Sequence, residues 1–164
     1  QHYKNFSSMS WVYSCGAGAN YGTALESALK MGETIHIPSC CYEIEEYIHG
    51  PNLQLTPQYN VIFFDGNDGA SRRVEQVYKA TRKVTNRAYL ISNNPQLSRD
   101  GHVLSLSDTV SSELSPLVYL PFVQLLSFIV SNDLHSIYQH PLLKEFKAIA
   151  AAKTENFVNY DGDD

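Results

Sequence analysis

The stretch Asn60-Val61-Ile62-Phe63-Phe64-Asp65 is the clearest strand signal in this chain. Almost all of it is apolar, which is typical of a central parallel strand covered by helices on both faces. Gly66 and Gly69 follow, and glycines at this place end a strand and begin a turn. The segment therefore predicts a buried parallel sheet, around which the rest of the chain is organised.

Strand and helix signals alternate on both sides of this segment. Four further strands are predicted, at residues 11–15, 35–37, 88–91 and 102–106. Helices are predicted at residues 21–33, 41–47, 116–130 and 140–151, and another precedes the strand at 88–91, with Val74, Val77, Tyr78 and Thr81 pointing inward. This order predicts an α/β fold with an open, mostly parallel five-stranded sheet and helices on both faces. Ligands bind beyond the carboxyl ends of such strands, so loops 15–21, 38–42 and 65–72 are the expected ligand loops.

The composition favours one folded domain and excludes some classes of partner. The 164 residues are 43% hydrophobic, which suits one folded domain, residues 1–164. Lys and Arg number 12 against 17 Asp and Glu, and no basic block is present, so no nucleic-acid partner is expected. The most apolar stretch, residues 116–130, is shorter than the roughly 20 residues that span a bilayer, so no membrane partner is expected either.

The cysteines and the start of the chain carry two further expectations. Cys15, Cys40 and Cys41 are an odd number and have no zinc-type spacing, which favours reduced thiols in a cytoplasmic protein and no metal site. The chain begins at Gln1 rather than at a methionine, so we expect a trimmed or internal piece of a longer protein.

A glycine-rich turn follows the first predicted strand. Gly16, Gly18 and Gly22 are spaced one residue too far apart for the dinucleotide-binding fingerprint, and no phosphate-binding P-loop motif exists. A glycine turn at a helix N-terminus can still receive an anion or a sugar oxygen on backbone N–H groups, and Asn20 could cap that helix. Gly16, Gly18 and Asn20 are therefore candidate substrate-binding residues, and a purely structural turn is the alternative.

The helix that follows carries Glu26, Lys30 and Glu33 on one stripe. Spacings of four and three place these side chains beside one another. One interpretation is a solvated ion-pair ladder. The other is a functional site in which Lys30, a further candidate substrate-binding residue, holds Glu33, which acts as a general base.

Two other residues are candidates from their local context. His49 precedes Gly50-Pro51, where a helix must stop, so its ring is expected at the surface or in a cleft; a structural histidine is the alternative. Lys153 follows the last predicted helix, where it is either a favourable helix-end cation or an amine that forms a Schiff base with a carbonyl substrate.

Taken in order, three segments resemble the sugar isomerase (SIS) domain. They are Gly16-Ala17-Gly18-Ala19-Asn20-Tyr21, Ala24-Leu25-Glu26-Ser27-Ala28-Leu29-Lys30-Met31-Gly32-Glu33 and Glu46-Tyr47-Ile48-His49-Gly50-Pro51. The resemblance runs over residues 11–157 and is closest to the C-terminal SIS domain of glucosamine-6-phosphate synthases and fructoselysine-6-phosphate-type deglycases. It implies a flavodoxin-like SIS fold and the C-terminal half of a double-SIS protein, with the N-terminal SIS domain and a homodimer mate as partners.

The resemblance also implies roles for the candidate residues. Glu33 matches the glutamate that moves a proton between the first two carbons of a sugar phosphate, without metal or cofactor. His49 matches the histidine that assists ring opening and often reaches a neighbouring subunit's site. Lys153 is the nearest equivalent of an imine-forming lysine, although its surroundings differ from the family pattern. The chain then acts as an isomerase, aminotransferase or deglycase module, and deglycase-type chemistry is favoured because the chain contains no glutaminase segment.

One departure from the family pattern keeps other functions open. Phosphate-gripping SIS domains carry an S-x-S-G-x-T loop, whereas the corresponding loop here contains Asp65 and Asp68, which repel phosphate. Only Ser71, Arg72 and Arg73 could help to bind it. A non-catalytic phosphosugar-sensing module is therefore the rival hypothesis, and a flavin- or nucleotide-binding domain is the third.

Overall fold

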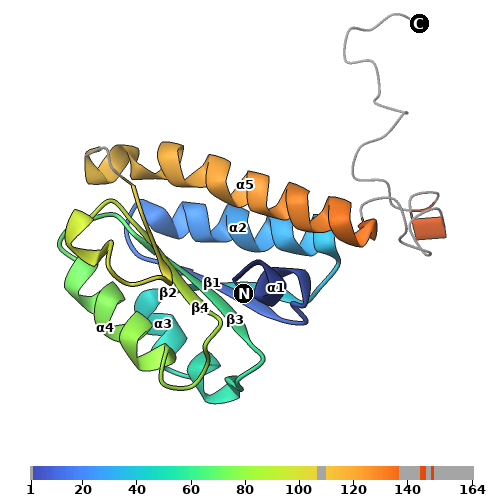
Figure 1. The fold of residues 1–164 in the computed structure, drawn as a ribbon, viewed down its shortest axis with the longest axis horizontal. Coiled ribbons are helices and arrows are strands. Elements are labelled where there is room, and N and C mark those ends of the chain that lie inside the picture. Colours follow the sequence, from blue (N-terminus) through green and yellow to red (C-terminus); the bar gives the residue numbers. More distant parts are fainter. Residues whose placement is uncertain (1, 107–109, 137–144, 147–148, 150–164) are drawn as a thin grey trace, which may run out of the picture.

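The computed structural model describes residues 2–106, 110–136, 145, 146 and 149, and five parallel strands form one sheet within them (Figure 1). The strands lie in the order β2-β1-β3-β4-β5. Their bounds are Val12–Gly16 for β1, Ser39–Glu43 for β2, Asn60–Asp65 for β3, Ala88–Ser92 for β4 and Val103–Ser105 for β5. Every neighbouring pair is parallel, which confirms the predicted fold class.

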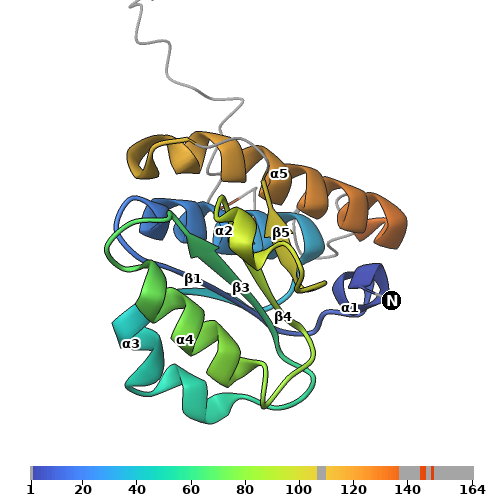
Figure 2. The ribbon, with the colours of Figure 1, turned by 60° about the vertical axis from the view of Figure 1, so that its left-hand side comes forward.

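Helices cover both faces of this sheet, as Figures 1 and 2 show. One face is covered by α1 (His2–Ser7), α2 (Asn20–Ile35) and α5 (Ser115–Leu134), and the other by α3 (Ile44–Ile48) and α4 (Ser71–Thr81). Short 3-10 turns lie at η1 (Pro51–Gln54), η2 (Pro95–Leu97) and η3 (Ser112–Leu114). The sheet therefore separates two cores, one on each face.

The central strand β3 is buried along its whole length. Ile62 and Phe64 join the core beneath α2 and α5, and Val61 and Phe63 join the core beneath α3 and α4. Successive side chains of a strand point to opposite faces, so a strand covered on both sides needs apolar residues at almost every position. The apolar run in the sequence is explained in this way.

The strand predicted at residues 35–37 is wrong. Ile35 ends α2 four residues after Met31, and both side chains are buried on the same face of that helix. His36 then takes a left-handed conformation, with φ 63° and ψ 39°, and its N–H donates to the carbonyl of Gly32. Two isoleucines that flank a histidine fit the alternation of a strand and the end of an apolar helical stripe equally well. Here Ile35 continues α2 and packs into the core beside Met31.

The next strand begins later, at Ser39, and this displaces the following helix as well. Residues 39–43 pair with β1 as the edge strand β2, so the helix predicted from residue 41 begins at Ile44. The Glu43 carboxylate accepts a hydrogen bond of 2.6 Å from the backbone N–H of Glu45, which caps α3.

Helix α5 is longer than the predicted segment 116–130. With the preceding turn it forms the 23-residue segment Ser112–Leu134, which contains an 18-residue window of mean hydropathy 1.7 and is long and apolar enough to cross a membrane. The prediction that this helix is too short to cross a membrane is therefore wrong. One such helix is weak evidence for a span, because core helices of soluble proteins reach the same length and hydropathy. Here α5 packs along α2, and Tyr119, Val123 and Val130 of α5 are buried in the core between the helices and the sheet.

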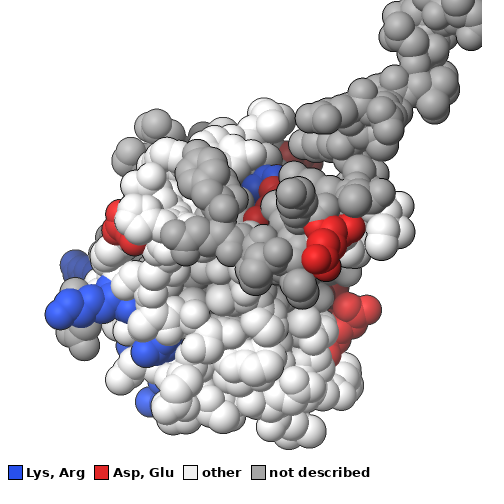
Figure 3. Space-filling view, turned by 90° about the vertical axis from the view of Figure 1, so that its right-hand side faces the viewer, with Lys and Arg blue, Asp and Glu red and all other residues white. Residues whose placement is uncertain are grey.

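The distribution of charge is uneven. On the face drawn in Figure 3, Lys and Arg side chains gather mainly at the lower left and Asp and Glu mainly at the right, although some acidic side chains lie beside basic ones, and uncharged atoms cover much of the described surface. This face carries no continuous basic surface of the kind that binds nucleic acid.

Candidate functional site

The glycine turn brings the start of α2 against the end of β1. A side chain at Gly16 would place its Cβ 2.3 Å from the carbonyl oxygen of Asn20, and Gly18 has a φ of +54°. No residue larger than glycine fits the first position, and few residues adopt the second conformation. The requirements of the turn itself therefore explain both glycines, whether or not a ligand binds there.

Asn20 is the first residue of α2, and its side chain is buried. Its Nδ2 donates to Ser115 Oγ over 2.7 Å, and its Oδ1 accepts from Thr23 Oγ1 over 3.0 Å. The helix cap is Ala19, which has no side-chain capping bond, so the prediction that Asn20 caps the helix is wrong. Asn20 instead joins the start of α2 to the start of α5.

The loop after β3 uses one carboxylate to hold itself together. Asp65 is fully buried and accepts hydrogen bonds from the backbone N–H of Asn67 at 3.0 Å, from Ser92 Oγ at 2.7 Å and from Ser71 Oγ. These bonds satisfy the carboxylate inside the protein. Ser71 was a candidate for binding phosphate, but its hydroxyl donates to Asp65 instead.

A second carboxylate of this loop lies beside the glycine turn. Asp68 Oδ1 accepts from the backbone N–H of Ala70 at 2.8 Å, and Oδ2 is 3.4 Å from the position that a Cβ of Gly18 would take. A negative charge therefore stands where an anion would approach the start of α2. This geometry agrees with the departure from the phosphate-gripping pattern.

Lys30 forms the predicted ion-pair ladder with two glutamates. Its Nζ lies 3.4 Å from Glu26 Oε1 and donates to Glu33 Oε1. The hydrogen bond to Glu33 raises the pKa of Lys30 above its usual value, which keeps the lysine charged. The Glu33 side chain is 45% exposed, so its carboxylate is both held by a cation and accessible from outside.

The glycine turn and the ladder lie at opposite ends of α2. The helix has 16 residues, which at 1.5 Å per residue spans about 24 Å. Because α2 runs back along the parallel strands, Gly18 lies at the carboxyl edge of the sheet and Glu33 lies toward its amino edge. One chain therefore does not bring these two groups of candidate residues into one site.

His49 lies on the other face of the sheet, directly after α3. It is exposed, as predicted, and its backbone N–H donates to the carbonyl of Glu46. Since α2 covers the opposite face, His49 and Glu33 are also separated within one chain. A site that uses both residues has to be completed by a second chain or domain.

An ion pair fixes α3 to α4 close to His49. Arg73 donates from Nε to Glu45 Oε1 at 2.6 Å and from its second guanidinium nitrogen to Oε2 at 3.0 Å. The hydrogen bond from Arg73 holds the pKa of Glu45 below its usual value. Arg73, which the sequence offered to a phosphate, is therefore already matched by a carboxylate. Arg72 is exposed on the same helix.

Neither the imine-forming lysine nor a metal site is found among the described residues. Lys153 lies outside the described residues, as does most of the helix predicted at residues 140–151. Within the part of the chain that the structure describes, no group of three or more His, Cys, Asp or Glu side chains could hold a metal ion.

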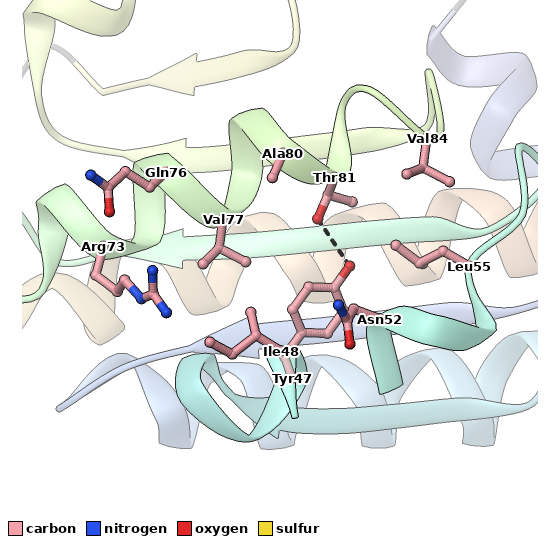
Figure 4. A pocket seen from close by; sticks show the side chains of 10 residues that line it. All are labelled: Tyr47, Ile48, Asn52, Leu55, Arg73, Gln76, Val77, Ala80, Thr81 and Val84. Carbon is pink, nitrogen blue, oxygen red and sulfur yellow. Dashed lines mark hydrogen bonds between the residues drawn. The ribbon is translucent and has the colours of Figure 1, made fainter. Parts of the chain in front are cut away.

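A cavity that no sequence pattern predicted lies between α3, η1 and α4 (Figure 4). Its volume is about 320 Å³, and its walls include Tyr47, Ile48, Asn52, Val77 and Thr81. No motif marks it, because its residues come from three segments that only the packing of α3 against α4 brings together.

An open, all-parallel five-stranded sheet with helices on both faces defines an α/β domain of the doubly wound class. The model of the SIS domain family matches residues 6–116, which is more than half of the chain. The chain belongs to the SIS domain family.

Two curated relatives match over most of this chain. A glutamine–fructose-6-phosphate aminotransferase [isomerizing] of Methanothermobacter thermautotrophicus is 30% identical over 131 residues, or 77% of this chain and 22% of the relative. One from Xylella fastidiosa is 28% identical over 125 residues, or 75% of this chain and 20% of the relative. The chain thus spans about one-fifth of the length of these relatives.

Solved structures share the fold. The tagatose-6-phosphate ketose/aldose isomerase of Escherichia coli superposes with a TM-score of 0.70 at 17% identity, covering 80% of this chain and 39% of that one. The C-terminal domain of glucosamine-fructose-6-phosphate aminotransferase from Francisella tularensis gives 0.68 at 23% identity, covering 79% and 37%. At these identities the likeness establishes the fold.

Proposed function

We propose that this chain is the C-terminal SIS domain of a double-SIS, cytoplasmic enzyme that acts on a ketose phosphate or an amino-linked sugar phosphate. Glu33 moves a proton between C1 and C2 of the open-chain sugar through an enediol or enolamine, and His49 assists ring opening. The observation that carries the proposal is the accessible Glu33 carboxylate held by the charged Lys30. The printed names of the aminotransferase and isomerase relatives support the substrate class.

The candidate residues lie apart within one chain, which supports a second domain and a second subunit as partners that complete the site. Glu33 and His49 lie on opposite faces of the sheet, and the acidic loop beside Gly18 disfavours phosphate. We therefore assign the phosphate grip to the N-terminal SIS domain and the completion of the site to a homodimer mate. Lys153 remains the candidate imine-forming residue in the same proposal.

An exposed apolar surface on α2 and α5 offers a place for that partner. The residues of this surface are Leu25, Leu29, Leu125 and Phe128, each between 49% and 60% exposed. Large apolar side chains exposed on two helices that pack side by side are typical of an interaction site. We expect Phe128→Asp to weaken association as measured by light scattering. A protein that is monomeric at every concentration would contradict the homodimer.

The catalytic proposal is tested by exchange of solvent deuterium into C1 and C2. The assembled protein is incubated in D₂O with fructose 6-phosphate or a fructosamine 6-phosphate, and the sugar is examined by NMR. Glu33→Gln should abolish incorporation, because an amide cannot take up the proton. The matched control is Glu75→Gln, which removes a carboxylate from a comparable ion pair on α4. In that pair Glu75 Oε2 lies 3.0 Å from Lys79 Nζ.

Two outcomes would reject this function. Wild-type incorporation by the Glu33→Gln variant would show that another group moves the proton. Saturable binding of the sugar phosphates by the wild-type protein, without any deuterium incorporation, would favour the rival phosphosugar-sensing module.

A further inference from the structure

A polar cavity opens at the amino edge of the sheet. Its volume is about 240 Å³, and its walls are formed by His2, Asn5, Pro57, Asn86, Arg87 and His102. Arg87 directly precedes β4 and His102 directly precedes β5, so the cavity lies at the edge opposite the carboxyl ends of the strands, where ligands of parallel sheets usually bind. It is also separate from the Lys30 ladder, because α2 packs mainly against β1 and β2.

Arg87 brings a positive charge to this cavity that no described carboxylate neutralises. Its Nη1 donates to the carbonyl of Ser8 over 3.2 Å and to Asn60 Oδ1 over 3.5 Å. A guanidinium carries five N–H donors in a planar fork, and no acceptor among the described residues takes those of Nε and Nη2. The half-buried Arg87 therefore has both a charge and hydrogen-bond donors left for a ligand.

Two imidazole rings share the cavity with this arginine. The rings of His2 and His102 meet edge to face with their centroids 4.6 Å apart. Burial, and next the positive charge of Arg82 and of His2, lower the pKa of His102 below its usual value. Positive groups therefore crowd around His102 and resist the addition of another proton.

One carboxylate opposes these positive groups, and it stands outside the cavity wall. The charged and titratable groups that face His102 are Arg82 of α4, His2 of α1, Tyr89 of β4 and Asp100 of the preceding loop. Asp100 Oδ1 lies 3.8 Å from His102 Nδ1, and Asp100 also accepts a hydrogen bond of 2.8 Å from the Tyr78 hydroxyl. None of the residues that line the cavity is acidic. The lining therefore favours an anion over a cation or an apolar molecule.

We propose that this cavity binds a small inorganic oxyanion of the sulfate or phosphate type. The free N–H groups of Arg87 pair with oxygens of the anion, as guanidinium forks commonly do, and His2 and His102 add charged donors when they are protonated. The volume is below the roughly 300–1,000 Å³ of sites for organic ligands, which suits an ion with a few water molecules better than a whole sugar phosphate. The site does not rest on the proposed function.

The test uses the ¹⁵N-labelled chain, with sodium sulfate as the probe and sodium chloride at equal ionic strength as the control. Sulfate should shift the amide signals around Asn86, Arg87 and His102 saturably. Arg87→Gln should weaken sulfate binding at least about tenfold, because it removes a charged donor. Arg99→Gln removes the same charge from an exposed arginine outside the cavity wall, and it should change the affinity less than about twofold.

A second variant avoids the contacts that Arg87 makes with Ser8 and Asn60. His2→Gln removes an exposed imidazole and should weaken sulfate binding about threefold at pH 5.5 while changing it little at pH 8. Sulfate does not titrate in this range, so the pH dependence reports on the imidazoles. Because linkage is reciprocal, sulfate should also raise the pKa of His2 and His102, which the ring-proton signals measure.

Specific results would overturn this inference. Absence of saturable shifts, equal shifts with chloride, or equal affinities of the Arg87→Gln and Arg99→Gln variants would each reject the site. Unchanged imidazole pKa values in sulfate would reject the part assigned to the histidines. Fructose 6-phosphate that shifts the same signals with more than about tenfold tighter affinity than sulfate would give the site to a phosphate ester instead of a free ion. Glu33→Gln should bind sulfate as the wild type does, so this site and the proposed function are tested separately.

Discussion

Replacement of Gly16 by alanine should destabilise the fold more than any other glycine-to-alanine change in the glycine turn. The new Cβ would lie 2.3 Å from the carbonyl oxygen and 2.8 Å from the carbonyl carbon of Asn20. Real Cβ atoms do not approach backbone atoms this closely, so the first turn of α2 has to move away from β1. This movement disturbs the buried hydrogen bond between Asn20 and Ser115 as well.

The magnitude follows from the cost of overpacking. Inserting one methyl group into a tightly packed site costs about 1–3 kcal/mol, and a clash with backbone belongs at the upper end, about 3 kcal/mol. For a domain of this size 1 kcal/mol changes the melting temperature by about 2–4 °C, so Gly16→Ala should melt about 6–12 °C lower.

Gly22→Ala is the matched control. Gly22 lies in the first turn of α2, and a Cβ there would meet nothing within 4 Å. Alanine is the better helix former, so this variant should gain about 0.5 kcal/mol. Denaturant unfolding followed by circular dichroism measures both variants. A Gly16→Ala protein as stable as the wild type, or a Gly22→Ala protein that loses as much, would refute the close packing of α2 on β1.

Three further predictions follow from other buried or half-buried groups. Tyr119→Phe removes a buried 2.7 Å hydrogen bond to the carbonyl of Asp65 and should cost about 1–2 kcal/mol in denaturant unfolding; an unchanged midpoint would contradict it. Burial raises the pKa of Cys41 to about 12, so iodoacetamide at pH 8 should modify the exposed Cys40 before Cys41. Mass spectrometry measures the order of modification, and modification of Cys41 first would contradict this prediction. Burial lowers the pKa of the His102 imidazole below its ordinary 6.5. The folded protein therefore protonates His102 less readily than the unfolded chain does. The stability that is present above pH 6.5 is consequently lost as the pH falls below 6.5 toward the folded-state pKa. The free energy of unfolding of His102→Gln should therefore fall less than that of the wild type between pH 7.5 and 5, and parallel curves would refute this.

The parts of the fold that the sequence predicted well are those with a strong local pattern. Strand β3 occupies the predicted residues 60–65, and β4 begins at Ala88 as expected. The ladder of Lys30 with Glu26 and Glu33 followed from helical spacing alone. The exposure of His49 followed from the helix stop before Gly50-Pro51.

The edge strand β2 is the part that the local pattern misplaced. Four of the five residues Ser39–Glu43 are half-buried and Cys40 is exposed, so the segment lacks the apolar run that marks β3. Its pairing with β1 decides that it is a strand, and that pairing involves residues more than 20 positions away. The extension of α2 through Ile35 likewise depends on the core into which that side chain packs.

By itself, the amino-acid sequence determined the class of the fold, the central strand and the residue types that carry the proposed chemistry, because periodicity and short-range spacing act between residues within a few positions of one another. Only the tertiary structure decided that Glu33, His49 and Gly18 lie apart within one chain, since a helix that crosses the whole sheet separates its two ends by about 24 Å. It also decided that Asp68 lies beside the glycine turn and that a cavity forms between α3, η1 and α4. These features arise from the packing of distant segments, which no local pattern encodes.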